Sequence, residues 1–142
     1  MHQALSLARE AADAGEVPVG CVIAGPDGTI LGRGRNRREE RNLSTAHAEI
    51  EAIEEACRTL GDWRLDGCSL YVSLEPCPMC AGAIINSRLS EVIFAAGDDS
   101  MGSCGSVLDL FYEPFGHSPA CIRGICSKES EELMKTFFRK LR

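Results

Sequence analysis

The chain has 142 residues, which is enough for one domain with a single hydrophobic core. Its 44% apolar and 25% charged residues are typical of a soluble globular protein, and no apolar run is long enough to span a bilayer. The formal charge of −6 argues against indiscriminate binding to polyanions, although it is compatible with a local basic face.

A helix and a hairpin are predicted first along the chain. Residues 2–14 carry apolar side chains at helical spacing, so we expect an amphipathic helix. Two strands, 17–24 and 29–35, lie on either side of the turn residues 25–28. Residues 36–43 are predicted to be a charged loop. Arginines gather around it and form either a basic face or an ordinary solvated surface: Arg33, Arg35, Arg37, Arg38 and Arg41.

The next helix is predicted to run from an N-cap at Ser44 or Thr45 to Leu60. It begins with His47 and Glu49, which are two positions apart and therefore do not share a helix face. They can serve one site only if that site lies beyond the N-terminal end of the helix. The predicted apolar stripe at helical spacing comprises Ala46, Ile50, Ile53, Cys57 and Leu60.

An apolar strand, 69–74, leads into the sequence Glu-Pro-Cys-Pro-Met-Cys. Pro76 cannot continue a strand, and the proline directly after Cys77 suits the first position of a helix. Cys77 is therefore expected to cap a helix that runs to about Asn86, with Cys80 in its first turn. Residues three apart lie close together on a helix, so both sulfur atoms can bind one ion. The helix N-terminus also favours thiolates.

The remaining chain predicts further α/β structure. A strand, a Gly/Ser/Asp loop, a short helix, another strand and a final helix are expected at 91–96, 97–106, 107–111, 121–126 and 129–141. Because helices alternate with strands, we predict an α/β fold: three α/β/α layers around a mixed five-stranded sheet. We expect residues 1–142 to form a single domain. The cations of the last helix either complement its dipole or form a basic face: Lys135, Arg139, Lys140 and Arg142.

The eight cysteines are scattered along the chain. Six of them lie outside the Cys77–Cys80 motif, and we interpret most of these as small buried hydrophobic residues in a reducing compartment. Cys104, in a Gly/Ser-rich loop, is expected to be the most exposed. Because no secretory leader is recognisable, we expect a cytoplasmic protein.

His47, Cys77 and Cys80 are three ligands, one short of the usual four for zinc, and this pattern is typical of catalytic sites. Zinc lowers the pKa of bound water to about 7 and so supplies a nucleophile at neutral pH. Glu49, free of the metal, is placed to move protons. His-x-Glu with Pro-Cys-x-x-Cys marks the zinc nucleobase deaminases. A redox Cys-x-x-Cys pair and a structural zinc site are the alternatives.

The chain resembles the bacterial tRNA adenosine deaminases (TadA type) of the cytidine-deaminase-like superfamily over almost its whole length. Six segments carry the resemblance: Pro18-Val19-Gly20, Asn36-Arg37, Thr45 to Glu49, Glu75 to Ala83, Gly105-Ser106 and Phe137-Phe138-Arg139. The resemblance implies conversion of adenosine to inosine at the wobble position of a tRNA anticodon. It also implies one zinc ion per subunit and a homodimer whose interface helps to build the RNA site.

The same resemblance implies roles for individual residues. Asn36 would contact the target base or sugar, Asp98 would lie near the nucleotide, and Val19 and Ala48 would border the substrate. Phe138 and the basic tail would meet the anticodon stem-loop. The simpler interpretations are that Val19 and Phe138 belong to the core and that Asn36 is a turn residue.

Two other functions remain possible from the sequence. One is a deaminase of a free base or nucleoside of the guanine or cytosine type. The other is a non-catalytic binding module that keeps the metal for structure.

Overall fold

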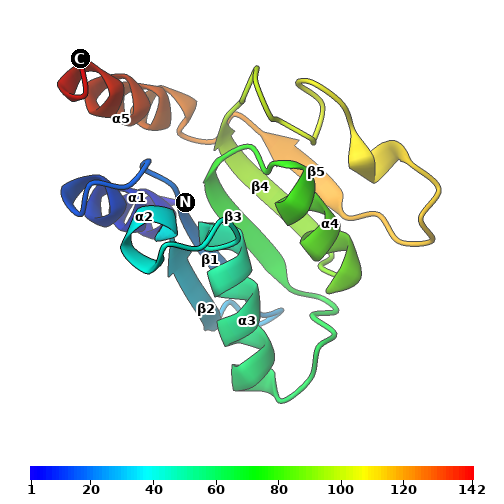
Figure 1. Ribbon diagram of the computed structural model, residues 1–142. Coiled ribbons are helices and arrows are strands. Elements are labelled where there is room, and N and C mark those ends of the chain that lie inside the picture. Colours follow the sequence, from blue (N-terminus) through cyan, green and yellow to red (C-terminus); the bar gives the residue numbers. More distant parts are fainter.

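The computed structural model describes residues 1–142 and confirms the predicted amphipathic helix and hairpin (Figure 1). Helix α1 (His2–Asp13) buries one face, made of Ala4, Leu5, Ala8 and Ala11. Strands β1 (Gly20–Ala24) and β2 (Ile30–Arg35) pair antiparallel. The first strand starts later than the predicted residue 17. Pro18 has no N–H for a strand ladder, and residues 17–19 are not part of the strand.

The sheet has five strands in the order β2-β1-β3-β4-β5. Strand β3 (Ser69–Leu74) is antiparallel to β1, whereas β3, β4 (Glu91–Ala96) and β5 (Ala120–Arg123) are parallel to one another. The mixed five-stranded sheet is therefore confirmed. The C-terminal ends of β3 and β4 lie at one edge, where ligands usually bind in α/β proteins.

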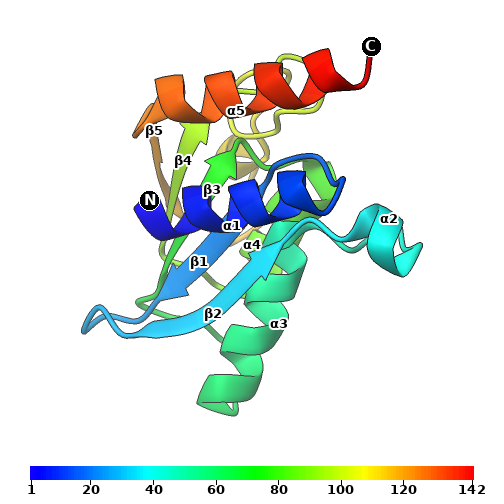
Figure 2. The same ribbon diagram turned by 90° about the vertical axis from the view of Figure 1, so that its left-hand side faces the viewer.

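Helices cover both faces of the sheet, so the three-layer prediction is confirmed. Helices α1 and α5 (Ser127–Lys140) pack together and against β1, β3 and β4, while α3 (Ala48–Leu60) and α4 (Pro78–Asn86) pack on the other face. Figure 2 shows α1 and α5 side by side in front, with α3 behind them at the β1–β2 side. None of the helices has the length and hydrophobicity needed to cross a bilayer.

Helix α3 packs on β2 through a face that overlaps the predicted stripe only at Ile53 and the partly buried Cys57. Its buried apolar residues are Ala48, Ala52, Ile53 and Ala56, whereas Leu60 is 46% exposed. A Cβ atom on Gly34 or Gly32 would overlap the carbonyl oxygen of Ala48 or Ala52. The strand thus lacks side chains where the helix backbone approaches it. Small residues four apart occupy the contact for this reason, and the larger apolar residues lie beside it.

Several element boundaries also differ from the prediction. The charged loop contains a short helix, α2 (Arg38–Arg41), and the predicted helix at 107–111 is a 3-10 turn at Leu110–Tyr112. Strand β5 ends at Arg123 rather than at residue 126, because Gly124 adopts a φ of +86°. Helix α5 then begins two residues earlier than expected, after Cys126.

The cysteine prediction is confirmed only in part, because three of the six cysteines outside the motif are buried (Cys21, Cys68 and Cys104) and Cys57 and Cys126 are partly exposed. Cys104 is only 6% exposed, because its loop folds back and forms a bridge with Asp109. Cys121 on the edge strand β5 is the exposed one, and all eight cysteines are free.

Candidate active site

Two helix N-termini meet at the candidate site, as the sequence predicted. His47 is the N-cap of α3, with an extended backbone (φ −84°, ψ 155°), and replaces the predicted Ser44 or Thr45. Cys77 is the N-cap of α4, which starts at Pro78 and carries Cys80 in its first turn. At a cap, the His47 side chain can reach beyond the helix end, which explains how it and Glu49 border one site.

The three donor atoms have the spacing that a metal ion requires. The Nδ1 atom of His47 lies 3.6 Å from Sγ of Cys77 and 3.5 Å from Sγ of Cys80. Sulfur and nitrogen ligands at about 2.3 Å and about 2.1 Å from one tetrahedral ion lie about 3.6 Å apart. The set could therefore hold a divalent ion, and no fourth His, Cys or carboxylate belongs to the group.

The thiols also differ in acidity. A hydrogen bond with Cys80, followed by the contact with His47, lowers the pKa of Cys77 to about 4. The same bond and burial raise the pKa of Cys80 well above its ordinary value. One sulfur atom of the pair is thus a thiolate at neutral pH, the form that binds metals.

Glu49 lies in the first turn of α3 and is 4% exposed. Burial, the largest cause, raises the pKa of its carboxyl group to about 7. It borders a pocket of about 310 Å³ together with His47 and Cys77. A carboxyl group that faces the pocket but stands outside the donor set can accept and release a proton there.

Four of the five predicted substrate-binding residues line this pocket: Val19, Asn36, Ala48 and Asp98. Phe138 does not. It lies on α5, 42% exposed, in an adjoining groove of about 490 Å³ that shares Val17, Leu74 and Asp98 with the pocket. Phe138 is therefore not a core residue, and the pocket continues along α5.

The polar side chains at the pocket are held by local bonds. Nδ2 of Asn36 donates to the carbonyl oxygen of Val17 at 3.3 Å, and Oδ1 accepts from the N–H of Arg38 at 3.2 Å. Oδ1 of Asp98 accepts from the N–H and Oγ of Ser100 at 2.9 and 2.7 Å. These contacts fix the two turns that border the pocket.

Sequence reasoning missed five pocket residues: Val17, Arg38, Leu74, Glu75 and Met101. A signal existed for Arg38, which belongs to the arginine cluster, and for Glu75, which directly precedes Pro76. Met101 comes from the loop after β4, whose path depends on long-range contacts.

Glu75 holds that loop in place. Its side chain is fully buried, and Oε1 accepts from Ser106 Oγ at 2.7 Å and from the Arg123 guanidinium at 3.0 Å. Oε2 has no hydrogen-bond partner and lies against Gly102, where any Cβ atom would overlap it. The N–H of Ser103 donates to the carbonyl oxygen of Pro76 at 2.9 Å. The loop is therefore tied to the segment that carries Cys77.

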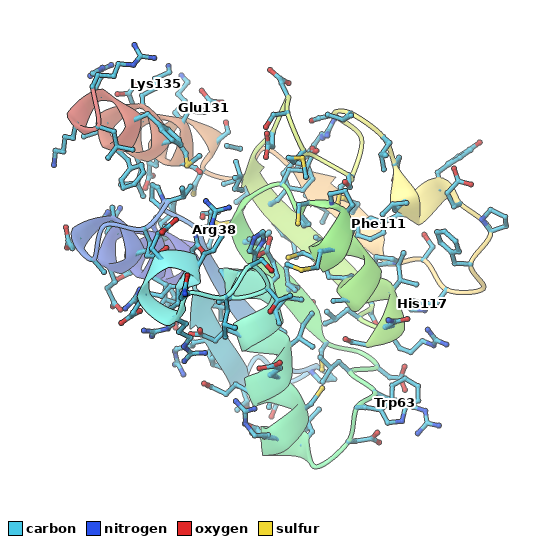
Figure 3. The ribbon with its side chains drawn as sticks, in the orientation of Figure 1. Arg38, Trp63, Phe111, His117, Glu131 and Lys135 are labelled. Carbon is cyan, nitrogen blue, oxygen red and sulfur yellow. The ribbon has the colours of Figure 1, made fainter.

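His117 lies away from the candidate site. His117 forms a 2.7 Å hydrogen bond with the carbonyl oxygen of Leu89, just beyond the C-terminal end of α4. Figure 3 shows it at the end of the molecule away from Arg38.

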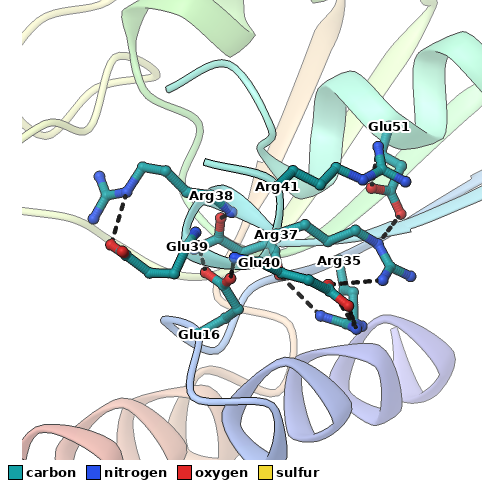
Figure 4. A network of polar contacts seen from close by, with 9 residues as sticks. Glu16, Arg35, Arg37, Arg38, Glu39, Glu40, Arg41 and Glu51 are labelled. Atoms are coloured by element: carbon teal, nitrogen blue, oxygen red, sulfur yellow. Dashed lines mark hydrogen bonds and ion pairs between the residues drawn. The ribbon is translucent and has the colours of Figure 1, made fainter. Parts of the chain in front are cut away.

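Most of the arginine cluster is paired internally rather than forming a basic face (Figure 4). Arg35 and Arg37 contact Glu40 at 3.1 and 3.0 Å. Arg37 and Arg41 contact Glu51 at 2.9 and 3.5 Å.

The chain is similar to known proteins along its whole length. The MafB19-like deaminase family matches residues 1–142. The chain is 44% identical to the tRNA-specific adenosine deaminase of Bacillus subtilis (strain 168) over 143 residues, which covers 100% of this chain and 88% of that protein. It is also 43% identical to a tRNA(Ile)-lysidine synthase of Deinococcus deserti, but it spans only 27% of that longer protein.

Solved structures of similar proteins have the same fold. One comes from a study of A-to-I editing by tRNA:A34 deaminases at the wobble position of transfer RNA. It superimposes with a TM-score of 0.89 at 42% identity, covering 94% of this chain and 96% of that one. A guanine deaminase from Bacillus subtilis gives a TM-score of 0.67 at 35% identity, covering 97% and 90%. The chain belongs to the MafB19-like deaminase family, in the cytidine-deaminase-like superfamily, and is a relative of the bacterial tRNA-specific adenosine deaminases.

Proposed function

We propose that this protein is a zinc-dependent tRNA adenosine deaminase that converts adenosine to inosine at the wobble position of an anticodon. The observation that carries the proposal is the joint geometry of His47, Cys77, Cys80 and Glu49 at one pocket. Similarity to the Bacillus subtilis enzyme and to the A34 deaminase structure supports tRNA as the substrate.

In this proposal His47, Cys77 and Cys80 hold one zinc ion per subunit. The ion would supply an activated water molecule at the coordination position that the protein leaves free. The donor distances and the absence of a fourth side chain in the group support this assignment.

Glu49 moves the protons of the reaction. Adenosine and water become inosine and ammonia, so the attacking water must give up both of its protons, one to a ring nitrogen of the purine and one to the leaving amine. Glu49 takes the first proton, passes it to the purine ring and delivers the second to the amine. Its burial beside the donor set supports this role.

The remaining residues bind the RNA. Val19 and Ala48 border the base, and Asn36 and Asp98 contact the nucleotide. Phe138 and its basic neighbours on α5 receive the stem-loop along the groove that joins the pocket. A base in an RNA loop is readily extruded into such a pocket and stacks on aromatic rings.

Residues 1–142 act as a single deaminase domain, and two copies form a homodimer in the cytoplasm, where mature tRNA is found. Support for the dimer comes from exposed apolar side chains near the pocket loop: Val107, Leu108, Tyr112 and Phe115.

A deaminase of a free base, of the guanine type, is the second candidate, because the Bacillus subtilis guanine deaminase shares the fold. The deciding experiment incubates zinc-loaded protein with anticodon stem-loops that carry adenosine at the wobble position, and in parallel with free guanine, adenine and cytosine. Inosine in the RNA supports our proposal. Ammonia release from a free base with unchanged RNA would replace it with the second candidate.

A further inference from the structure

Acidic residues outnumber basic ones among the residues that line the pocket. Glu49, Glu75 and Asp98 line it, and Arg38 is the only lysine or arginine among the lining residues. The whole chain carries a formal charge of −6. An RNA strand brings one negative charge per phosphate, so a cation at the pocket entrance would strengthen its binding.

Arg38 is the arginine of α2 that is free for this task. Arg35, Arg37 and Arg41 all pair with Glu40 or Glu51 at 2.9 to 3.5 Å. The contact of Arg38 with Glu39 is longer, at 3.8 Å, and both side chains are more than half exposed. Such a surface pair contributes little. In Figure 4 the Arg38 side chain extends away from the other three arginines.

The backbone of Arg38 is firmly held. Its N–H donates to Oδ1 of Asn36, and its carbonyl oxygen accepts from the N–H of Leu43 at 3.1 Å. The carboxylate of Glu16, which is 1% exposed, accepts from the N–H groups of Glu39 and Glu40 at 3.2 and 2.6 Å.

The same turn is tied to the metal site. The N–H of Arg37 donates to the carbonyl oxygen of Ala46 at 2.9 Å, one residue before His47. The position of Arg38 relative to the donor set is therefore fixed by the fold.

On the basis of the proposed function, we infer that Arg38 binds a backbone phosphate of the RNA strand at the nucleotide that enters the pocket. The planar guanidinium offers two parallel N–H donors that match a phosphate group. In this role Arg38 acts on the strand and not on the reacting atoms, so it is a positioning residue. It anchors the strand while the base is inserted beside Glu49.

The test compares Arg38→Ala, Arg38→Lys and Arg33→Ala. Arg33 is exposed on β2 and lies outside the pocket. Arg33→Ala therefore makes the same change in net charge without altering the pocket lining. For Arg38→Ala we expect KM for the stem-loop to rise about tenfold or more, with kcat changed less than about twofold. The slope of log affinity against log salt should become shallower by about 0.7. For Arg38→Lys we expect the salt slope of the wild type, because the charge is kept. Its KM should lie between the values of the wild type and Arg38→Ala. Metal content and Tm are measured for each variant.

Binding is measured separately from turnover, so the two proposals can fail separately. If wild-type protein deaminates the stem-loop but Arg38→Ala matches Arg33→Ala in KM and salt slope, the inference about Arg38 is wrong and the function stands. If wild-type protein binds the stem-loop without deaminating it, and Arg38→Ala alone weakens that binding, Arg38 keeps its role and the function is wrong. If wild-type protein neither binds nor deaminates the RNA, both are wrong.

Discussion

Glu49 is buried next to the three side chains that could hold a metal ion, without belonging to that group. Glu49→Gln keeps the size of the side chain but removes its ability to exchange a proton. We expect deamination to fall by at least about 100-fold with metal content unchanged. Inosine formation and zinc analysis by mass spectrometry check this result. Glu54→Gln, on the exposed face of the same helix, is the control, and full activity of Glu49→Gln would contradict the assigned role.

Cys80 is fully buried and supplies one of the three donors, so its loss should abolish metal binding. A metal that binds only the folded state stabilises it, and chelation should therefore lower the Tm of the wild-type protein. We expect Cys80→Ser to have a lower Tm than the wild type before any chelator is added. A chelator should not lower the Tm of this variant further. Cys121→Ser, at the exposed cysteine, should behave like the wild type. An unchanged zinc content in Cys80→Ser would contradict the ligand set.

The contact between β2 and α3 decides where His47 and Glu49 lie. Gly34→Ala places a methyl group against the backbone of Ala48, so we expect a loss of about 1–3 kcal/mol in the free energy of unfolding and weaker zinc binding. Gly82 in α4 has open space around its Cα atom. Gly82→Ala should therefore stabilise the protein by about 0.5–1 kcal/mol. Denaturant unfolding measures the free energy of unfolding of both variants. Equal changes in Gly34→Ala and Gly82→Ala would refute the close approach of β2 to the backbone of α3.

The loop after β4 depends on the ion pair between Glu75 and Arg123. Arg123→Ala leaves the buried carboxylate without its cation, and we expect a cost of about 1–3 kcal/mol. The double variant Arg123→Ala/Glu75→Gln should recover part of this loss, because the second substitution removes the unpaired charge. Arg64→Ala, at an exposed pair with a 3.8 Å contact, should change stability by less than about 1 kcal/mol. Thermal unfolding of the wild type and these three variants distinguishes the outcomes.

The protein exposes large apolar side chains that no other part of the same chain covers. Tyr112 is 89% exposed, which is unusual for an aromatic side chain, and Phe115 beside it is 57% exposed. We expect sedimentation to give the mass of a dimer, and Tyr112→Glu to shift it towards the monomer with loss of activity on RNA. Leu60→Glu, at the exposed end of α3, serves as the control. A monomeric wild-type protein with full activity would refute the dimer.

Much of this arrangement could be predicted because its signals are local. Proline on both sides of Cys77 ends one strand and starts one helix, and α4 forms there. The apolar periodicity of α1 likewise identified its buried face. The buried face of α3 differs from the predicted stripe, because it is set by the glycines of β2 and not by a pattern within the helix.

The sequence alone determined the donor types, the free carboxyl group and the start of α4, since these follow from residue chemistry and short-range backbone preferences. Only the tertiary structure decided that Nδ1 of His47 faces both sulfur atoms. The fold also decided that Glu51 and Glu40 neutralise most of the arginine cluster, and that Glu75 fixes a loop on the pocket. Such contacts join residues that are distant along the chain, and their spacing is set by how helices and strands pack, not by any pattern within one segment.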